Sequence, residues 1–458
     1  MYWEEAVFDN DKLKDFKPDI IYIHTTNRNI TKFPQIIDSE DDIKALINNE
    51  YSRFEIMWEK LKENYSCPII QNNFEMLPYR IMGNKDVSDI HGRFYYMNSI
   101  NSKFYEYAQK NTNFYINDIN YLSANFGLNK WHDEVAWYMY KYCCSLEAIP
   151  HLAFNISNII KSLFGKNKKA LAIDLDNTLW GGVIGEDGIH GIALGKDNSM
   201  GQAYSEFQEY VKELKNLGIV LNIVSKNNYD DAQEGLNHPD MVLKPEDFMV
   251  IKANWDNKAS NIVDIAKTIN ILPESIVFLD DNPTERELVK SNIKNISVPE
   301  FDIVESYRKI LGNSGFFEIT TFSEEDIKRN EMYKQNLSRM NYESDFIDYN
   351  EYLKALNMNL TIMGFKNEYI PRITQLINKS NQFNLTTKRL TEEEVQNLAL
   401  DAKYTCLCAK LNDKFGDYGI ITNVIGRTEN NVMYIDLWLM SCRVLKKNVE
   451  KNMVDIIF

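Results

Sequence analysis

The sequence has no long hydrophobic run: no stretch of about 18 or more apolar residues occurs, which excludes an ordinary membrane-spanning helix. Its first residues, MYWEEAVFDN, lack the basic, apolar and small-residue order of a signal peptide, so we expect a soluble, cytoplasmic protein with no membrane partner. Basic residues are also scarce, with 51 Lys and Arg against 66 Asp and Glu and a formal net charge of −15. Because nucleic-acid phosphates are bound by clustered Lys and Arg, this charge argues against a nucleic-acid partner.

Cysteine and histidine patterns that bind metals are missing as well. The six cysteines form no C-x-x-C pair and suit free thiols in a chain without a secretory signal: Cys67, Cys143, Cys144, Cys406, Cys408 and Cys442. We therefore predict neither disulfides nor zinc. The histidines do not cluster, and five are expected to be structural or surface residues: His24, His91, His132, His151 and His238. The sixth, His190, could touch a substrate.

The sequence does contain a regular alternation of strands and helices in its central part. At 458 residues, two or three domains are expected, and the pattern separates an N-terminal α/β region (1–165), a central α/β region (166–318), a charged helical connector (319–350) and a C-terminal α+β region with an antiparallel meander (351–458). In the central region the apolar strands ALAI, IVLNIV, DFMVI and SIVFL alternate with helical segments such as AYSEFQEYVKELKNLG, which Gly218 is placed to end. This pattern predicts a parallel sheet covered on both faces.

Polar residues follow the strands of this predicted sheet. The strand ALAI leads into Asp174, with Asp176 two positions later. Because the carboxyl ends of parallel strands face one crevice, we expect the residues after each strand to lie close together. One carboxylate, Asp174, can attack phosphorus as a nucleophile, while Asp176 protonates the leaving oxygen and then activates water.

The next two strands supply candidates for holding a phosphoryl group. The second strand ends at Ser225, whose hydroxyl and following amides can hold phosphoryl oxygens, and the candidate phosphate-binding residues are Thr178, Ser225, Lys226 and Asn227. After the third strand comes Lys258, which could neutralise charge on the transferring group.

The fourth strand, SIVFL, leads into two further carboxylates, Asp280 and Asp281. Together with Asp174 and Asp176 they supply the hard oxygen ligands that Mg²⁺ prefers. A cation would also screen the repulsion that keeps a carboxylate from attacking a phosphate. We therefore predict Mg²⁺ as the cofactor, with Asp174, Asp176, Asp280 and Asp281 as its candidate ligands.

Turn and cap chemistry is the alternative for any single one of these residues, because Asp, Asn and Ser are favoured at turns. Asn282 followed by Pro283 does predict a helix start. Turn chemistry does not require carboxylates after both outer strands, however, so the set as a whole indicates a catalytic site. The glycines of WGGVIGEDG lack a G-x-G-x-x-G order and predict the tight turns of a β-hairpin flap over that site.

The order D-x-D-x-T, Ser, Lys and DD, each after a strand, resembles the haloacid dehalogenase (HAD) superfamily. Over about residues 168–450 the sequence resembles the FkbH-like proteins, a subfamily of HAD phosphatases. The motifs that carry this resemblance are DLDNTLWGGVIGEDG, VSKNN, NWDNKASNI, VFLDDNPTERE, NQFNLTTKR, DKFGDYGII and SCRVLKKNVE. The resemblance implies a HAD-type, Rossmann-like parallel sheet joined to a C-terminal region similar to GNAT acetyltransferases and an N-terminal region similar to SGNH hydrolases. The N-terminal region has no G-D-S signature and is expected to be non-catalytic, and the GNAT-like region is expected to be incomplete.

The resemblance also implies a reaction. A glyceryl group passes from 1,3-bisphosphoglycerate to the phosphopantetheine thiol of an acyl carrier protein, through a thioester on an enzyme cysteine, and the HAD site removes the remaining phosphate. Cys442, in SCRV, matches a family motif and is the candidate thiolate nucleophile, although a small buried thiol is the alternative. Many family members have a cysteine before the first HAD strand, where this chain has Ala170.

Two other functions stay open. One is a plain phosphatase acting on a small phosphorylated metabolite, with a vestigial C-terminal region. The other is a non-catalytic interaction module, against which the intact set of Asp174, Asp176, Lys258 and Asp281 argues. The glyceryl transfer would serve the biosynthesis of a natural product or a surface polysaccharide.

Overall fold

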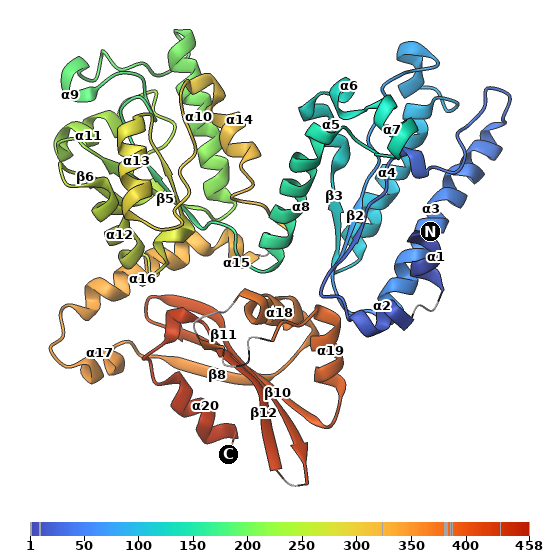
Figure 1. Ribbon diagram of the computed structural model, residues 1–458. Coiled ribbons are helices and arrows are strands. Elements are labelled where there is room, and N and C mark those ends of the chain that lie inside the picture. The colour runs from blue at the N-terminus through green and yellow to red at the C-terminus, as the bar shows by residue number, and fades with distance from the viewer. Residues whose placement is uncertain are drawn as a thin grey trace. The chain divides into compact units, whose positions relative to one another are not determined.

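The computed structural model describes residues 2–8, 11–322, 324–379, 383–384, 386, 388–430 and 432–457. The chain divides into two compact units, the first made of Met1–Ile160 and Arg389–Leu400, the second of Lys161–Lys388 and Asp401–Phe458. Figure 1 shows the helices and strands of both units along the chain.

A small parallel sheet forms the centre of the first unit. Its strands β1 (Ile21–Ile23), β2 (Ile69–Asn72) and β3 (Phe114–Asn117) lie side by side in that order. The core against it is aromatic, with Trp58 edge-on to Phe104 and Phe114 at centroid distances of 4.8 and 4.7 Å. The helices are α1 (Tyr2–Val7), α2 (Asp11–Phe16), α3 (Glu40–Asn64), α4 (Arg93–Lys110), α5 (Ile119–Phe126), α6 (Leu128–Trp131), α7 (Glu134–Tyr140), α8 (Ile149–Leu163) and α19 (Glu392–Leu400).

The second unit contains the predicted central sheet. Its strands β4 (Ala170–Ile173), β5 (Val220–Ser225), β6 (Phe248–Ala253) and β7 (Ile276–Leu279) are parallel and ordered β6-β5-β4-β7. Alternate side chains of β4 enter different cores, Leu171 with Phe207 on one face and Ala172 with Ile262 on the other. Both faces are therefore covered, as predicted, by α10 (Ser199–Asn216), α11 (Tyr229–Leu236), α12 (Lys258–Thr268), α13 (Pro283–Asn292) and α14 (Val304–Asn313).

Two predicted helix boundaries are confirmed. Helix α10 is followed at Gly218 by a backbone φ of +91°, which favours glycine, and a Cβ there would lie 2.2 Å from the carbonyl oxygen of Asp326. Helix α13 begins at Pro283, and the Asn282 side chain before it accepts a hydrogen bond of 2.9 Å from the backbone N–H of Thr284.

The predicted β-hairpin flap after Asp176 is wrong. Only isolated bridges form there, between Asp176 and Trp180 and between Gly181 and Ala193. The short helix α9 (Ile184–Asp187) takes the place of a strand. The Asp187 carboxylate accepts a 2.7 Å hydrogen bond from the N–H of Val183, which closes a helical turn where a hairpin would need an extended chain.

The C-terminal part of the second unit contains the predicted antiparallel meander. Its sheet runs β8 (Asn359–Gly364), β10 (Tyr404–Asp413), β11 (Gly416–Glu429), β12 (Val432–Met440) and β9 (Phe383–Asn384), with every pairing antiparallel. Its helices and those of the connector are α15 (Glu324–Ile327), α16 (Arg329–Glu343), α17 (Tyr349–Ala355), α18 (Ile370–Lys379) and α20 (Val449–Ile457). The α/β class of the chain, with a separate antiparallel sheet, is thus confirmed.

Within the described residues, no helix combines the length and apolar character needed to cross a membrane.

Candidate active site

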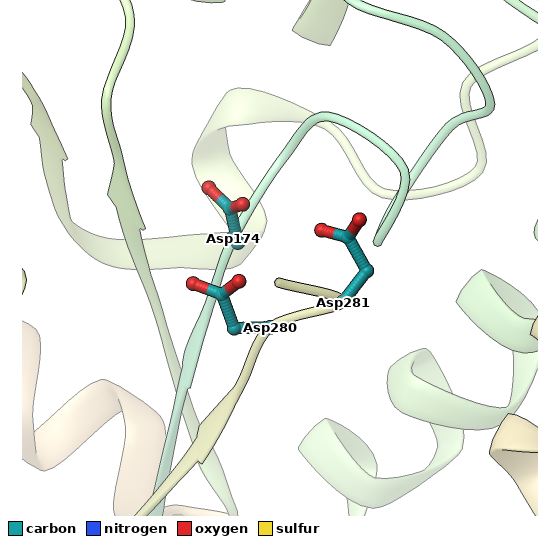
Figure 2. Close-up of side chains that lie close together, drawn as sticks. All are labelled: Asp174, Asp280 and Asp281. Atoms are coloured by element: carbon teal, nitrogen blue, oxygen red, sulfur yellow. The ribbon is translucent and has the colours of Figure 1, made fainter. Parts of the chain in front are cut away.

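The carboxyl ends of β4 and β7 bring three carboxylates together (Figure 2). Asp174 follows β4 directly, and Asp280 and Asp281 follow β7, its neighbour in the sheet. The register explains the meeting, because Ile173 pairs with Leu279 and the residues after them therefore leave the sheet side by side. One oxygen of each carboxylate lies within 4.8 Å of the other two. Among the residues that the structure describes, this is the one group of three or more His, Cys, Asp or Glu side chains able to hold a metal ion.

Lys258 joins two of these carboxylates. Its Nζ lies 3.0 Å from Asp174 Oδ2 and 2.6 Å from Asp280 Oδ2. The residue is the first of α12, and the Asn257 side chain caps that helix by accepting a 2.8 Å hydrogen bond from the N–H of Ala259. One ammonium beside three carboxylates leaves an excess of negative charge, which a divalent cation would compensate.

Burial changes the acidity of these groups. Burial, with the Asp174 charge beside it, raises the pKa of Asp280 to about 7, although Lys258 opposes the shift. The pKa of Asp281 is raised by the same two causes. Burial disfavours the charged form of Lys258, but Asp174 and Asp280 outweigh it and hold the lysine pKa above its ordinary value. Lys258 therefore stays charged, and a cation at this place would stabilise the ionised forms of Asp280 and Asp281.

Asp174 offers one oxygen that the protein does not use. Its Oδ1 is buried and has no hydrogen-bond partner among the described residues, whereas Oδ2 receives Lys258. A buried carboxylate oxygen without a partner is costly unless a metal ion or substrate engages it. The donor set of three carboxylates is the hard-oxygen set that Mg²⁺ takes, so the residues present fit that ion.

Asp176, predicted as both catalytic residue and metal ligand, has its carboxylate outside this cluster. Its Oδ1 accepts hydrogen bonds from Trp180 Nε1 at 2.9 Å and from the N–H of Ile184 at 3.0 Å, and its Oδ2 accepts one from Asn227 Nδ2 at 2.8 Å. Three donors therefore hold the side chain away from the other aspartates. To act as a general acid it must exchange one of these bonds for a substrate oxygen.

The candidate phosphate-binding residues lie around Asp176 and Asp281. The amide of Asn227 bridges Asp176 and Ser225, donating to Ser225 Oγ at 3.2 Å. Lys226 pairs instead with Glu285, with 2.7 Å between Lys226 Nζ and Glu285 Oε1. Ser225 and Asn227 therefore lie together at the end of β5, while the positive charge of Lys226 is paired with the Glu285 carboxylate.

Thr178, another candidate phosphate ligand, contacts a carboxylate instead. Its hydroxyl accepts a 3.2 Å hydrogen bond from the N–H of Asp281 and lies 3.5 Å from Asp281 Oδ1. The threonine is fully buried, so in this arrangement it positions Asp281.

Cys442, the candidate thioester residue, begins a short 3-10 helix (Cys442–Val444), but its side chain lies outside the described residues.

Sequence reasoning missed two side chains that build the site. Arg286 is buried in the first turn of α13 and donates from Nη1 to the carbonyl oxygens of Asp280, Asp281 and Phe301 at 3.0, 2.6 and 3.0 Å. A basic residue in the first turn of a helix is unfavourable for the helix dipole, so an arginine at this position of the sequence indicates that its charge is needed for another contact. Trp180 holds Asp176 through its indole N–H; its place in an apolar stretch gave no such signal.

Comparison with known proteins agrees with this geometry. Residues 3–161 match the family described as FkbH, N-terminal domain. Among solved structures, the chain is similar to the N-terminal part of the protein BF1531 from Bacteroides fragilis, which contains a phosphatase domain and was crystallised with Mg, at 33% sequence identity and a TM-score of 0.65 over 70% of this chain and 84% of that chain. No curated protein matches the chain.

The four-stranded parallel sheet, with Asp174, Asp280, Asp281 and Lys258 at its carboxyl end, defines a protein of the HAD type. Within that class, the chain belongs to the FkbH-like proteins.

Proposed function

We propose that this chain is a Mg²⁺-dependent phosphatase of the HAD type. The observation that carries the proposal is the buried cluster of Asp174, Asp280 and Asp281 with Lys258 bonded into it. The Mg²⁺ in the BF1531 structure, which shares 33% identity with this chain, supports the same cofactor here. Bound beside these carboxylates, Mg²⁺ would neutralise their charge and that of the phosphoryl oxygens.

The residues of the chain divide the chemistry among them. Asp174 attacks phosphorus through its unpartnered oxygen, because Oδ1 is free while Oδ2 is held by Lys258. Lys258 stays charged and stabilises the negative charge of the transferring group. Asp176 protonates the leaving oxygen and then takes a proton from the attacking water. Ser225 holds phosphoryl oxygens, and Asn227 positions Asp176 through its amide.

The finer proposal is that the phosphatase reaction serves a glyceryl transfer. The donor would be 1,3-bisphosphoglycerate, the acceptor the phosphopantetheine thiol of an acyl carrier protein, and the carrier on the enzyme a thioester at Cys442. Membership of the FkbH-like proteins supports this reaction, as does the C-terminal sheet that accompanies the HAD part. The products would enter natural-product or surface-polysaccharide biosynthesis.

The test of the phosphatase is phosphate release with and without Mg²⁺ from a panel of three-carbon phosphates that includes phosphoglycerates and an acyl phosphate. Asp174→Asn is expected to lose more than about 1,000-fold in rate, on the scale of an enzyme without its nucleophile. The matched control is Asp264→Asn, an exposed carboxylate on α12. No Mg²⁺-dependent release from the folded wild type on any of these substrates, or equal loss in both variants, would contradict the proposal.

The glyceryl transfer is tested by the mass gained by a phosphopantetheinylated carrier protein incubated with the enzyme and an acyl phosphate. We expect Cys442→Ala to abolish the gain and to keep phosphate release. An unchanged rate of transfer would exclude Cys442 as the thioester residue, and no gain with wild type would leave a plain metabolite phosphatase.

A further inference from the structure

The first unit has polar residues at the carboxyl ends of all three of its strands. His24 follows β1 directly, and Asn72 and Asn117 are the last residues of β2 and β3. The strands are parallel, so these ends lie at one edge of the sheet, where α/β proteins place their ligands. The amides are connected, since Asn117 Nδ2 donates to Asn72 Oδ1 at 2.7 Å.

A cysteine reaches this edge from a distant part of the chain. The Sγ atom of Cys143 lies 2.8 Å from His24 Nε2, although 119 positions separate the two residues. His24 is exposed and Cys143 is half-buried, so the pair is open to a small molecule from solvent. His24, expected from its sequence surroundings to be structural, is therefore placed as the base of a nucleophilic cysteine.

Two neighbours orient the imidazole in both of its charge states. Tyr22 lies 2.9 Å from His24 Nδ1 and gives its own hydrogen to Asn72 Oδ1, also at 2.9 Å, so its oxygen can accept from a protonated Nδ1. Nδ1 carries a hydrogen both in the protonated ring and in the neutral form whose Nε2 is unprotonated, so the Tyr22 oxygen can accept from it in both states, while the Asn72 amide, 3.1 Å from Nδ1, donates to the carbonyl oxygen of Thr25 at 3.0 Å. Nε2 of the neutral ring is then free to take the proton of the thiol that it faces, as a base beside a nucleophile requires.

The thiols near His24 differ in acidity. A hydrogen bond from the Cys144 thiol and one from His24 lower the pKa of Cys143 far below its ordinary value, while the pKa of Cys144 is raised. Burial instead raises the pKa of Cys67, a half-buried thiol of the same unit, to about 11. Cys143 is thus the thiol of this unit suited to be a thiolate at neutral pH.

We propose that Cys143 and His24 form a second catalytic site, which accepts an activated acyl group as a thioester on Cys143. The shared substrate chemistry is a carbonyl with a good leaving group, carried either by a pantetheine thioester or by an acyl phosphate. Transfer of such a group needs a nucleophile and a base, and both are present. An amide would also need an acid to protonate its poor leaving group, the amine. Among the described residues, His24 and Cys143 do not belong to a group of three or more His, Cys, Asp or Glu side chains able to hold a metal ion.

The step balances with these residues alone. Cys143 gives its proton to His24 Nε2, and its sulfur attacks the carbonyl carbon to form a C–S bond. The bond from that carbon to the leaving sulfur or phosphate oxygen breaks, and the leaving group departs with the electron pair. His24 returns the proton to a departing thiolate or releases it to solvent. The inference rests on the first unit and does not depend on the phosphatase function proposed above.

The test is mass-spectrometric peptide mapping of the full chain after incubation with acetyl phosphate or with acetyl-pantetheine, in separate arms. The expected result is an acetyl group on the Cys143 peptide, with the donor that works identifying the source of the acyl group. His24→Gln, which keeps the polar side chain but removes the base, is expected to slow the acylation about 100-fold. Cys67→Ser is the matched control and should not change it.

Iodoacetamide alkylation of the same proteins shows whether the Cys143 thiol is accessible, independently of whether it reacts with an acyl donor. Alkylation of Cys143 without acetylation by either donor would overturn the proposal, as would equal acetylation of Cys67 and Cys143 or an unchanged rate in His24→Gln. Because the acetylated peptide is mapped on the wild-type protein, misfolding of His24→Gln would not prevent a decision. Phosphate release by the HAD site reports that His24→Gln and Cys67→Ser remain folded elsewhere.

Discussion

The two aspartates of the D-x-D pair differ in what surrounds them, and that difference fixes their roles. Asp174 is bonded to Lys258 and has an open oxygen, while each oxygen of Asp176 accepts at least one hydrogen bond. A nucleophile needs a free lone pair, and a general acid needs a side chain that can exchange partners. The local hydrogen bonds thus assign the first role to Asp174 and leave the second to Asp176.

A substitution at Asn227 tests whether Asp176 is the general acid. Removing its amide in Asn227→Ala takes away the donor to Asp176 Oδ2 and the bridge to Ser225. If Asn227 positions the general acid, we expect kcat to fall about 10- to 100-fold with little change in KM, because the loss is confined to the transition state. Steady-state kinetics would measure it, with Asn228→Ala, an exposed neighbour, as the control. A large rise in KM would instead make Asn227 a direct phosphate ligand.

At the scale of elements, the strands could be predicted because continuous apolar runs in the sequence indicate that they are buried. Strands β4, β5 and β7 are buried along their whole length, and apolar runs bounded by turns predict that state. The convergence of Asp174 and Asp281 then followed from parallel topology. The helix α9 in place of the flap could not be predicted, because the glycine pattern gives no sign of the hydrogen bond from the N–H of Val183 to the Asp187 carboxylate that helps to close its turn. Nor could the partners of His24 and Cys143, since no local pattern links residues 119 positions apart.

The connector helix α16 is fixed to the C-terminal sheet by a buried ion pair. Arg339 donates from Nε and Nη2 to the two oxygens of Asp413 at 2.7 and 2.8 Å, and its guanidinium lies 3.9 Å from the Tyr418 ring centroid. Burial alone would raise the pKa of Asp413, but Arg339 lowers it below its ordinary value. The pair therefore stabilises the folded state above the unfolded carboxyl pKa, and this stabilisation is lost as the pH falls through the folded pKa.

Removing the arginine should be costly, because it leaves a buried carboxylate without its cation. Arg339→Met is expected to lower the free energy of unfolding of the second unit, which contains both residues, by about 3 kcal/mol at neutral pH. Arg308→Met, which breaks an exposed pair with Glu206, should cost less than about 1 kcal/mol. Denaturant unfolding at pH 7 and pH 4 would measure both. Equal effects of the two substitutions, or a larger Arg339 effect at the lower pH, would contradict this account of the ion pair.

At the scale of the whole molecule, two compact units with separate sheets imply that unfolding is not a single transition. The carboxylate cluster belongs to the second unit alone. A ligand that binds only the folded form stabilises what it binds, so Mg²⁺ should act on one transition and leave the other in place. Calorimetry can therefore locate the metal site without any assay of activity.

Mg²⁺ at about 100 times its Kd should stabilise the second unit by about 2.7 kcal/mol and raise the midpoint of that transition by about 5 °C. Asp281→Asn should lose the shift while remaining as stable as wild type without Mg²⁺, because burial and the Asp174 charge already raise the pKa of Asp281 and make its ionised form unfavourable. Asp264→Asn, with an exposed carboxylate, should keep the shift. A Mg²⁺ effect on both transitions, or one that survives in Asp281→Asn, would mean that the ion binds elsewhere on this acidic chain.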